Sequence, residues 1–318
     1  MGKQQTTVFL TGGLGNQLFQ YAAALSRDPE VLQLDCSLGN PRTNRDGEPD
    51  VFDFVLPRTP KKYRGKLPRY FFSKTAGFLL RQGMQPTKLE KNLLFRVLAL
   101  ASGTLSLSFW LSRPCRVVQA TDNGYWTMPK KFLNEYMIGY FQSCVWAEEP
   151  RVKDLLLKMR LVRPSEELTA FLRSESNFSA IAVHVRLGDY KQEIGLGIPS
   201  QNYYAEALSK LEDNETIERI WLFSNEPEDA ITFIPEKYKD YLVVVPSFRG
   251  DAAQTLEAMR HADRYIIANS SMSWWGAFLS YSDTTKVIAP QPWFKSNKEP
   301  TKLVPSNWDR LPAWPNQF

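Results

Sequence analysis

Residues 180–190, AIAVHVRLGDY, form a short apolar segment that ends in charged side chains. The segment places His184, Arg186 and Asp189 within six residues, and His184 is one of only two histidines in the chain. A strand in a protein core has no use for such residues, because burying an unpaired charge is costly. The pattern therefore predicts a strand that delivers charged groups to an anionic ligand at its end.

Around this segment, from about Pro164 onward, short apolar stretches alternate with helical ones. We expect strands at 180–186, 219–224, 241–245, 265–268 and 286–289, and helices at 202–211, 226–232, 251–261 and 271–281. Strands and helices that alternate with short links predict a parallel sheet covered on both faces. Ligands of such sheets bind at the carboxyl ends of the strands, which is where Arg186 stands.

The N-terminal part begins in a similar way, and the length of 318 residues favours two domains. We expect strands at 6–10, 31–35 and 115–120, helices at 16–26 and 151–161, and a long loop at 39–60. The first strand and helix are joined by the glycine turn TGGLGN, residues 11–16. It is no dinucleotide fingerprint, because Leu18 takes the place of the third glycine, and no Walker lysine follows. Its glycines let backbone amides approach a ligand; the alternative is a tight turn with Asn16 as a helix cap.

The net charge of +5 is unevenly spread along the chain. Residues 58–96 hold eleven Lys and Arg against one acid, Glu90, and we expect this basic block to be helical. Segment 92–112 is too rich in polar residues for a membrane span, so we expect amphipathic helices that lie partly in the core and rest on an anionic membrane; the alternative is a solvated basic face. Three widely spaced cysteines and no apolar leader favour the cytoplasm, with a peripheral contact at the inner membrane face.

A second candidate segment for anion binding is IIANSSMSWWGAFLS, residues 266–280. A strand runs into Asn269, Ser270 and Ser271, and a helix follows. Serine hydroxyls and unpaired amides at a helix N-terminus can hold a phosphate; the alternative is a serine cap alone. In WLFSNEPEDA, residues 221–230, we expect Ser224 or Asn225 to cap a helix. No residues have metal-ligand spacing, so a bound diphosphate has to be balanced by protein cations, with Arg186 first.

Taken together, six stretches resemble the α-1,2-fucosyltransferase family, particularly its bacterial members. They are, in family order, GGLGNQLFQYA, GYFQS, HVRLGDY, LFSNEPED, IIANSSMSWWGAFL and VIAPQPWF. The resemblance implies an α/β fold with two Rossmann-like domains facing a cleft, the glycosyltransferase B type. It also implies an inverting, metal-independent transferase without a cofactor. Its donor is GDP-β-L-fucose, and its acceptor is a terminal galactose on an oligosaccharide or lipid-linked glycan.

The domains expected on this basis are an acceptor-side domain at 1–163 with the basic insert, a donor domain at 164–300, and a tail at 301–318 that packs back on the first domain. The family motifs carry over to Arg186, which contacts the diphosphate, and to His184, which lies beside the nucleotide or orients that arginine. The other residues expected at the donor are Asn269, Ser270, Ser271, Ser224, Gly13, Gly15 and Gln17. Asn16 and Asp189 join Arg186 as candidate catalytic residues.

Asp189 is the first candidate for a catalytic base and Glu193 the second; the alternative for Asp189 is a structural partner of an arginine. The chain departs from the family pattern at two places. Leu187 stands where a second arginine is usual, and Phe223-Ser-Asn-Glu226 stands where Phe-Ser-Asp-Asp is frequent. These departures leave one supporting contact and one carboxylate role open.

Three other functions compete with this interpretation. The alternating sheet and glycine turn are also found in nicotinamide-dependent dehydrogenases, although the third glycine is missing here. Nine tryptophans and thirteen tyrosines would suit a non-catalytic sugar- or nucleotide-binding protein. The basic block would suit nucleic acid, but no recognition motif accompanies it, so we expect no nucleic-acid partner.

Overall fold

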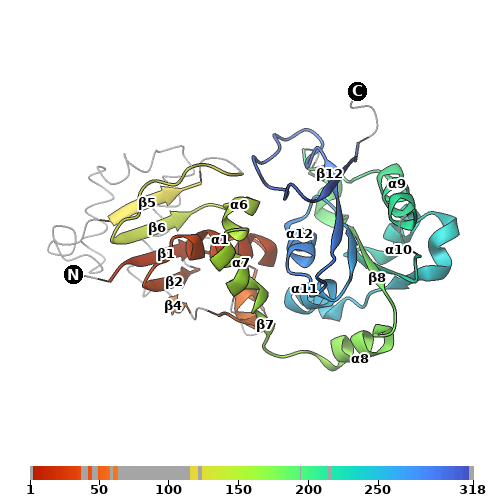
Figure 1. The fold of residues 1–318 in the computed structure, drawn as a ribbon, viewed down its shortest axis with the longest axis horizontal. Helices are drawn as coiled ribbons and strands as arrows, with labels where there is room; N and C mark the ends of the chain where they lie inside the picture. The colour runs from red at the N-terminus through yellow and green to blue at the C-terminus, as the bar shows by residue number, and fades with distance from the viewer. Residues whose placement is uncertain are drawn as a thin grey trace. The chain divides into compact units, whose positions relative to one another are not determined.

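The computed structural model describes residues 3–36, 42–44, 49–57, 60–63, 115–120, 124–193, 195–213 and 216–314. The chain divides into two compact units, each described here by itself. The first unit is Met1–Arg160 with Thr301–Leu303, and the second is Leu161–Pro300 with Val304–Phe318. Figure 1 shows that each unit is built around its own sheet.

The described part of the first unit has a five-stranded sheet in the order β4-β2-β1-β6-β5, and each neighbouring pair is parallel. Its strands are β1 (Gln5–Phe9), β2 (Val31–Asp35), β4 (Lys61–Tyr63), β5 (Cys115–Gln119) and β6 (Asn134–Ile138). Its helices are α1 (Leu14–Ser26), α6 (Cys144–Ala147) and α7 (Pro150–Leu157), with the 3-10 turn η1 (Asp50–Asp53) and the short strand β3 (Phe54–Val55). β7 (Arg160–Leu161) stands at the boundary of the two units.

The prediction of a helical basic block is wrong for the part of the block that the structure describes. Residues 61–63 form β4, which pairs with β2 in the sheet, so the backbone there is extended. Among the described strands β4 is the outermost on its side of the sheet, and edge strands tolerate lysines. Residues 64–96 of the block, and all of segment 92–112, lie outside the described residues. Within the described ranges, no helix has the length and apolar character needed to cross a membrane.

The described part of the second unit has a six-stranded sheet in the order β10-β9-β8-β11-β12-β13, again with parallel pairs. Its strands are β8 (Ala180–Val185), β9 (Arg219–Ser224), β10 (Leu242–Val244), β11 (Arg264–Ile266), β12 (Lys286–Gln291) and β13 (Asp309–Pro312). Its helices are α8 (Glu166–Glu175), α9 (Gln201–Glu212), α10 (Pro227–Ala230), α11 (Ala252–Arg260) and α12 (Ser271–Phe278). The 3-10 turns are η2 (Gly188–Lys191), η3 (Ile231–Phe233), η4 (Glu236–Tyr241) and η5 (Phe248–Gly250). The predicted α/β class with parallel sheets is confirmed.

The C-terminal tail divides differently from the expectation. Thr301–Leu303 lies with the first unit, where the Tyr125 amide donates a hydrogen bond to the Thr301 carbonyl at 2.6 Å. From Val304 onward the tail lies with the second unit, because β13 pairs with β12 and extends the sheet. The backbone groups of β13 therefore find their hydrogen bonds in the second unit.

Helices cover both faces of the second sheet, with α9 and α10 on one side and α11 and α12 on the other (Figure 1). Alternate residues of β8, namely Ile181, Val183 and Val185, pack in a core cluster with Tyr203 and Tyr204 of α9. Because side chains alternate along a strand, His184 points to the opposite face. The alternation thus separates a fully apolar face of β8 from the face that carries the polar residues.

Candidate functional site

The strand order of the second unit places a ligand position between β8 and β11. The chain runs from β8 outward through β9 and β10, and then returns to the other side of β8 for β11, β12 and β13. β8 and β11 are therefore neighbours at the point where the direction of winding changes. In sheets of this kind, ligands bind outside the carboxyl ends of the strands at that point. Arg186 follows β8 there, and Asn269 follows β11 after two further residues.

Arg186 is held by the turn that follows it. Its Nη2 pairs with Asp189 Oδ1 at 2.7 Å, and its guanidinium carbon lies 5.6 Å from the centre of the Tyr190 ring. Gly188 adopts a φ of +55°, which lets η2 bring Asp189 back toward the guanidinium. The Arg186 side chain is 22% exposed, so the cation is partly buried and still reachable from solvent.

The start of α12 lies beside this turn. Ser270 is the cap residue, and its Oγ accepts a hydrogen bond from the Met272 amide at 3.3 Å. The Tyr190 hydroxyl donates to the Asn269 carbonyl at 3.2 Å, which connects η2 to the start of α12. Burial raises the pKa of Tyr190 to about 12, so the phenol keeps this proton at neutral pH. The arginine and the helix N-terminus, where Ser271 is the first residue, thus belong to one local structure.

Two buried polar atoms lie next to these groups without a partner among the described residues. Asn269 donates through Nδ2 to the Leu196 and Gly197 carbonyls at 2.9 and 3.2 Å, whereas its Oδ1 has none. The Nδ1 of His184 has none either, and the residue is 6% exposed. Burial, assisted by the charge of Arg186, lowers the pKa of His184 to about 3. His184 is therefore a neutral imidazole and not a second cation.

The prediction that Ser224 or Asn225 caps the helix after β9 is wrong. The cap residue of α10 is Glu226, and no side chain caps that helix. Ser224 instead accepts a hydrogen bond from the Glu226 amide at 3.1 Å, and Asn225 Oδ1 accepts one from the Leu187 amide at 3.0 Å. This role of Asn225 was not predicted from the sequence. The available signal was an asparagine directly after the strand next to β8, because Asn side chains readily bind loop backbone.

The departure at Leu187 has a structural explanation in this chain. Leu187 is 2% exposed and belongs to the core cluster together with alternate residues of β8. An arginine at this position would place its guanidinium toward an apolar core. Leu187 therefore packs in the core. It does not make the supporting ion contact that an arginine could make at this position.

In the first unit, the glycine turn also lies where the winding direction changes, because β1 and β6 are neighbours. Asn16 is not the helix cap: α1 begins at Leu14 after an extended Gly13. Asn16 Oδ1 instead accepts a hydrogen bond from Gln142 Nε2 at 2.8 Å. Gly12 has a φ of +74°, which the turn requires.

Gln17 is fully buried and uses its amide group on backbone. Its Nε2 donates to the Gly12 and Arg42 carbonyls, both at 3.0 Å, and its Oε1 accepts from the Val51 amide at 3.0 Å. Gly15 is a buried residue within α1. Of the residues predicted in this unit, Gly13 lies in the turn, Gly15 and Asn16 lie in the first turn of α1, and Gln17 holds the glycine turn through its side chain.

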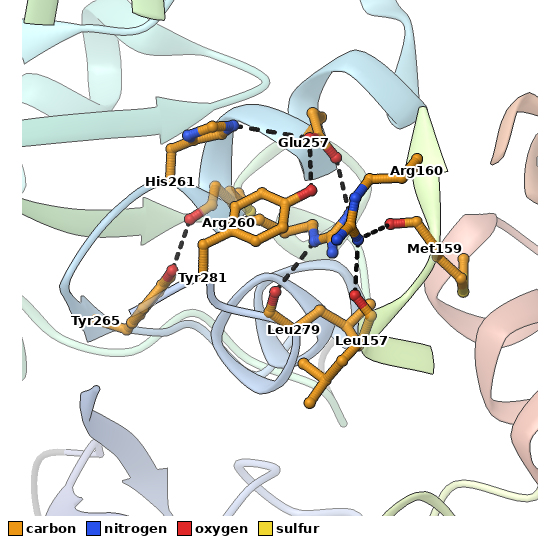
Figure 2. Close-up of polar contacts among 10 residues, drawn as sticks. Leu157, Met159, Arg160, Glu257, Arg260, His261, Tyr265, Leu279 and Tyr281 are labelled. Carbon is orange, nitrogen blue, oxygen red and sulfur yellow. Dashed lines mark hydrogen bonds and ion pairs between the residues drawn. The ribbon is translucent and has the colours of Figure 1, made fainter. Parts of the chain in front are cut away.

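A polar network anchors α12 at its other end (Figure 2). Arg260 is buried; its Nε donates to the Leu279 carbonyl at 3.0 Å, and its Nη1 pairs with Glu257 at 2.9 Å. Tyr281 donates to Glu257 at 2.8 Å, and its ring centre lies 4.2 Å from the Arg260 guanidinium carbon. His261, at the end of α11, lies 3.7 Å from Glu257. The network joins α11 to the end of α12 and so holds the helix whose N-terminus carries Ser270.

Comparisons with known proteins agree with the motifs. The family model described as glycosyl transferase family 11 matches residues 5–310. The O-antigen biosynthesis glycosyltransferase WbnK of Escherichia coli is 26% identical, over 95% of this chain and 99% of its own length. The alpha-1,2-colitosyltransferase of Escherichia coli is also 26% identical, over 55% of this chain and 61% of its own length.

Solved structures with similar folds include the fucosyltransferase NodZ from Bradyrhizobium, with 13% identity, a TM-score of 0.46, and coverage of 88% of this chain and 94% of that one. Another is a variant of Arabidopsis thaliana FUT1 in complex with GDP, with 12% identity, a TM-score of 0.48, and coverage of 92% and 72%. The resemblance seen in the sequence motifs is confirmed by the family match, which extends over nearly the whole chain. The chain belongs to glycosyl transferase family 11, and it is a glycosyltransferase.

Proposed function

We propose that this glycosyltransferase moves L-fucose from GDP-β-L-fucose to the 2-hydroxyl of a terminal galactose, with inversion to an α-1,2 linkage. The observation that carries the donor assignment is the position of Arg186 beside the N-terminus of α12, at the carboxyl ends of β8 and β11. A guanidinium and free helix amides are the groups that proteins use for a diphosphate. The family match supports the reaction class.

In the proposed reaction the bond between the sugar carbon and the diphosphate oxygen breaks while the acceptor oxygen attacks the opposite face. Negative charge then develops on the departing GDP. Arg186 and the backbone amides at Ser270 and Ser271 stabilise that charge, which is electrostatic catalysis by preorganised groups. The protein cation takes the role that a metal ion has in other transferases, so we expect activity without a divalent metal.

The acceptor hydroxyl has to lose its proton, and Asp189 is our first candidate for the base. Its Oδ1 pairs with Arg186 at 2.7 Å, and its side chain is 58% exposed. A carboxylate can orient the guanidinium through one oxygen and accept a proton on the other. Glu193 is the second candidate. Asn16, Gly13, Gly15 and Gln17 stay predicted donor-site residues, and the Gln17 side chain would act there by holding the glycine turn.

The names of the relatives support the linkage and the class of acceptor. One is named for O-antigen biosynthesis and one for alpha-1,2 transfer of colitose. We therefore propose a glycan acceptor of the bacterial surface that is assembled on a lipid carrier at the inner membrane face. The basic block would contact that membrane.

The decisive experiment is to measure GDP release from GDP-fucose across a panel of galactosides, with EDTA present. We expect release that depends on the acceptor, and an α-1,2 linkage in the product by NMR. A colitosyl donor serves as the competing sugar, because one relative is named for it. Tight binding of GDP, with no GDP released from GDP-fucose under any condition, would favour a non-catalytic binding protein. A product with another linkage would refute the proposed α-1,2 linkage.

A further inference from the structure

The position of the Arg186 guanidinium depends on a turn that the neighbouring strand holds in place. Arg186 is followed by Leu187, whose side chain is buried and whose amide donates to Asn225 Oδ1 at 3.0 Å. Asn225 comes directly after β9, the strand next to β8. The backbone that directly follows Arg186 is therefore bonded to the segment after β9, in addition to its covalent link to β8.

Gly188 packs against the same asparagine. A Cβ added to Gly188 would lie 2.2 Å from Asn225 Nδ2, and this glycine also has a φ of +55°. Such a distance is far inside van der Waals contact, so the turn and the asparagine side chain fit closely together. Asn225 thus touches the turn by a hydrogen bond at Leu187 and by direct packing at Gly188.

The other end of the turn has its own anchor on the same segment. Lys191 Nζ pairs with Glu226, and with Asp229 Oδ2 at 2.8 Å. These groups are exposed, and exposed ion pairs contribute little to stability. The hydrogen bond of Asn225 lies closer to Arg186 and is the less exposed of the two anchors.

We propose that Asn225 is a positioning residue for Arg186. By accepting the Leu187 amide, it fixes the turn so that the guanidinium points to where the donor diphosphate binds. This inference rests on the proposed function, because it assumes that Arg186 binds the diphosphate. Groups that stabilise developing charge have to be held within about half an ångström of their working position. Neighbouring side chains that pack against them or bind them by hydrogen bonds fix this position.

The inference also explains the departure from the frequent Phe-Ser-Asp-Asp pattern. The side chain at position 225 is used here as a hydrogen-bond acceptor for backbone, and an aspartate presents the same Oδ1 atom. Asn225→Asp should therefore keep the position of Arg186. Asn225→Leu has similar volume but removes the acceptor and should release the turn.

The test compares the two variants by calorimetric affinity for GDP and for guanosine, together with turnover of GDP-fucose. Asn225→Leu should lower the affinity for GDP about tenfold or more and leave that for guanosine within about twofold, because only GDP engages Arg186. Asn225→Asp should restore the GDP affinity. Ile217→Val, a buried change just before β9, is the control for lost stability and should alter neither affinity.

Equal losses for GDP and guanosine in Asn225→Leu would mean general damage and would overturn the inference. Unchanged GDP affinity in that variant would overturn it as well, while the proposed function would stand. If the wild-type protein binds no GDP, the proposed function itself fails. Should Asn225→Leu not fold, Gly188→Ala displaces the asparagine from the other side and has to produce the same split between GDP and guanosine.

Discussion

Protonation of His184 should couple the stability of the second unit to pH. The imidazole is 6% exposed, its Nδ1 has no partner among the described residues, and burial lowers its pKa to about 3 from an ordinary value of 6.5. In the unfolded chain the same group binds a proton below pH 6.5. Unfolding in mildly acidic solution therefore takes up a proton that the folded state does not bind.

The sign and size of the effect follow from this difference. The pKa of His184 is lower in the folded state than in the unfolded state. The contribution of neutral His184 to the free energy of unfolding is therefore fully present above pH 6.5 and is lost as the pH falls toward 3. Between pH 7 and pH 5 the decline amounts to about 2 kcal/mol, close to 1.4 kcal/mol for each pH unit below 6.5. That is a sizeable share of the stability of an ordinary domain.

The assay is urea unfolding followed by tryptophan fluorescence at pH 7 and pH 5. Wild type should lose about 2 kcal/mol more than His184→Gln between the two pH values, because the variant has no group to titrate at this position. Ile217→Val, which is destabilised without loss of a titratable group, should show the wild-type difference. The chain has two histidines, so NMR with labelled imidazoles can follow each one, and His261→Gln assigns the signals.

Parallel pH dependence of wild type and His184→Gln would refute the reasoning. So would a His184 signal that titrates near pH 6.5 in the folded protein. Either result would mean that the imidazole reaches solvent or a proton acceptor in the native state, and its assignment as a neutral group beside Arg186 would fail with it.

Three further predictions concern the site and the first unit. Arg186→Lys keeps the charge but loses the planar fork, so turnover should fall about a hundredfold, and near-normal rates would count against the diphosphate contact. Comparing the pH–rate profiles of Asp189→Asn and Glu193→Gln should identify the base: the acidic limb should vanish in the first variant and persist in the second, and two unchanged limbs would place the base elsewhere. Gly139→Ala should destabilise the protein by about 3 kcal/mol, because φ is +130° and the new Cβ would lie 2.5 Å from a neighbouring side chain. Gly250→Ala, at a φ of +77° with nothing within 4 Å, should cost about 1 kcal/mol, and similar urea midpoints for the two variants would contradict the clash.

Most of the second unit could be predicted from the sequence because its periodicity changes sharply between strands and helices. The strand expected at 219–224 is β9 at the same residues, and the helix expected at 202–211 is α9 at Gln201–Glu212. α9 has one buried face and β9 is buried along its middle, so the spacing of apolar residues follows the structure directly in both segments.

The elements that the sequence analysis missed lack such a pattern. β13 contains Asp309 and Arg310 and is a strand only because it pairs with β12, which is information from distant residues. β4 has the sequence Lys-Lys-Tyr and is a strand because it pairs with β2, which again is information from distant residues. Gln17 stays a predicted donor-site residue, but the three backbone partners of its side-chain amide were not predicted. No local pattern reveals the partners at Arg42 and Val51, because these residues lie 25 and 34 positions further along the chain.

The two places where the chain departs from the family pattern turn out to be the two ends of one hydrogen bond. The amide of Leu187 donates to the side chain of Asn225, and the side chain of Leu187 is buried in the core beneath the turn. Both departures therefore act on the same backbone segment, the one that carries Arg186. A second arginine at 187 would have to leave the core, and the turn would then lose the packing that complements the hydrogen bond. In this chain the support of Arg186 comes from an apolar side chain on one side and a neutral amide on the other, with Asp189 as its counter-charge.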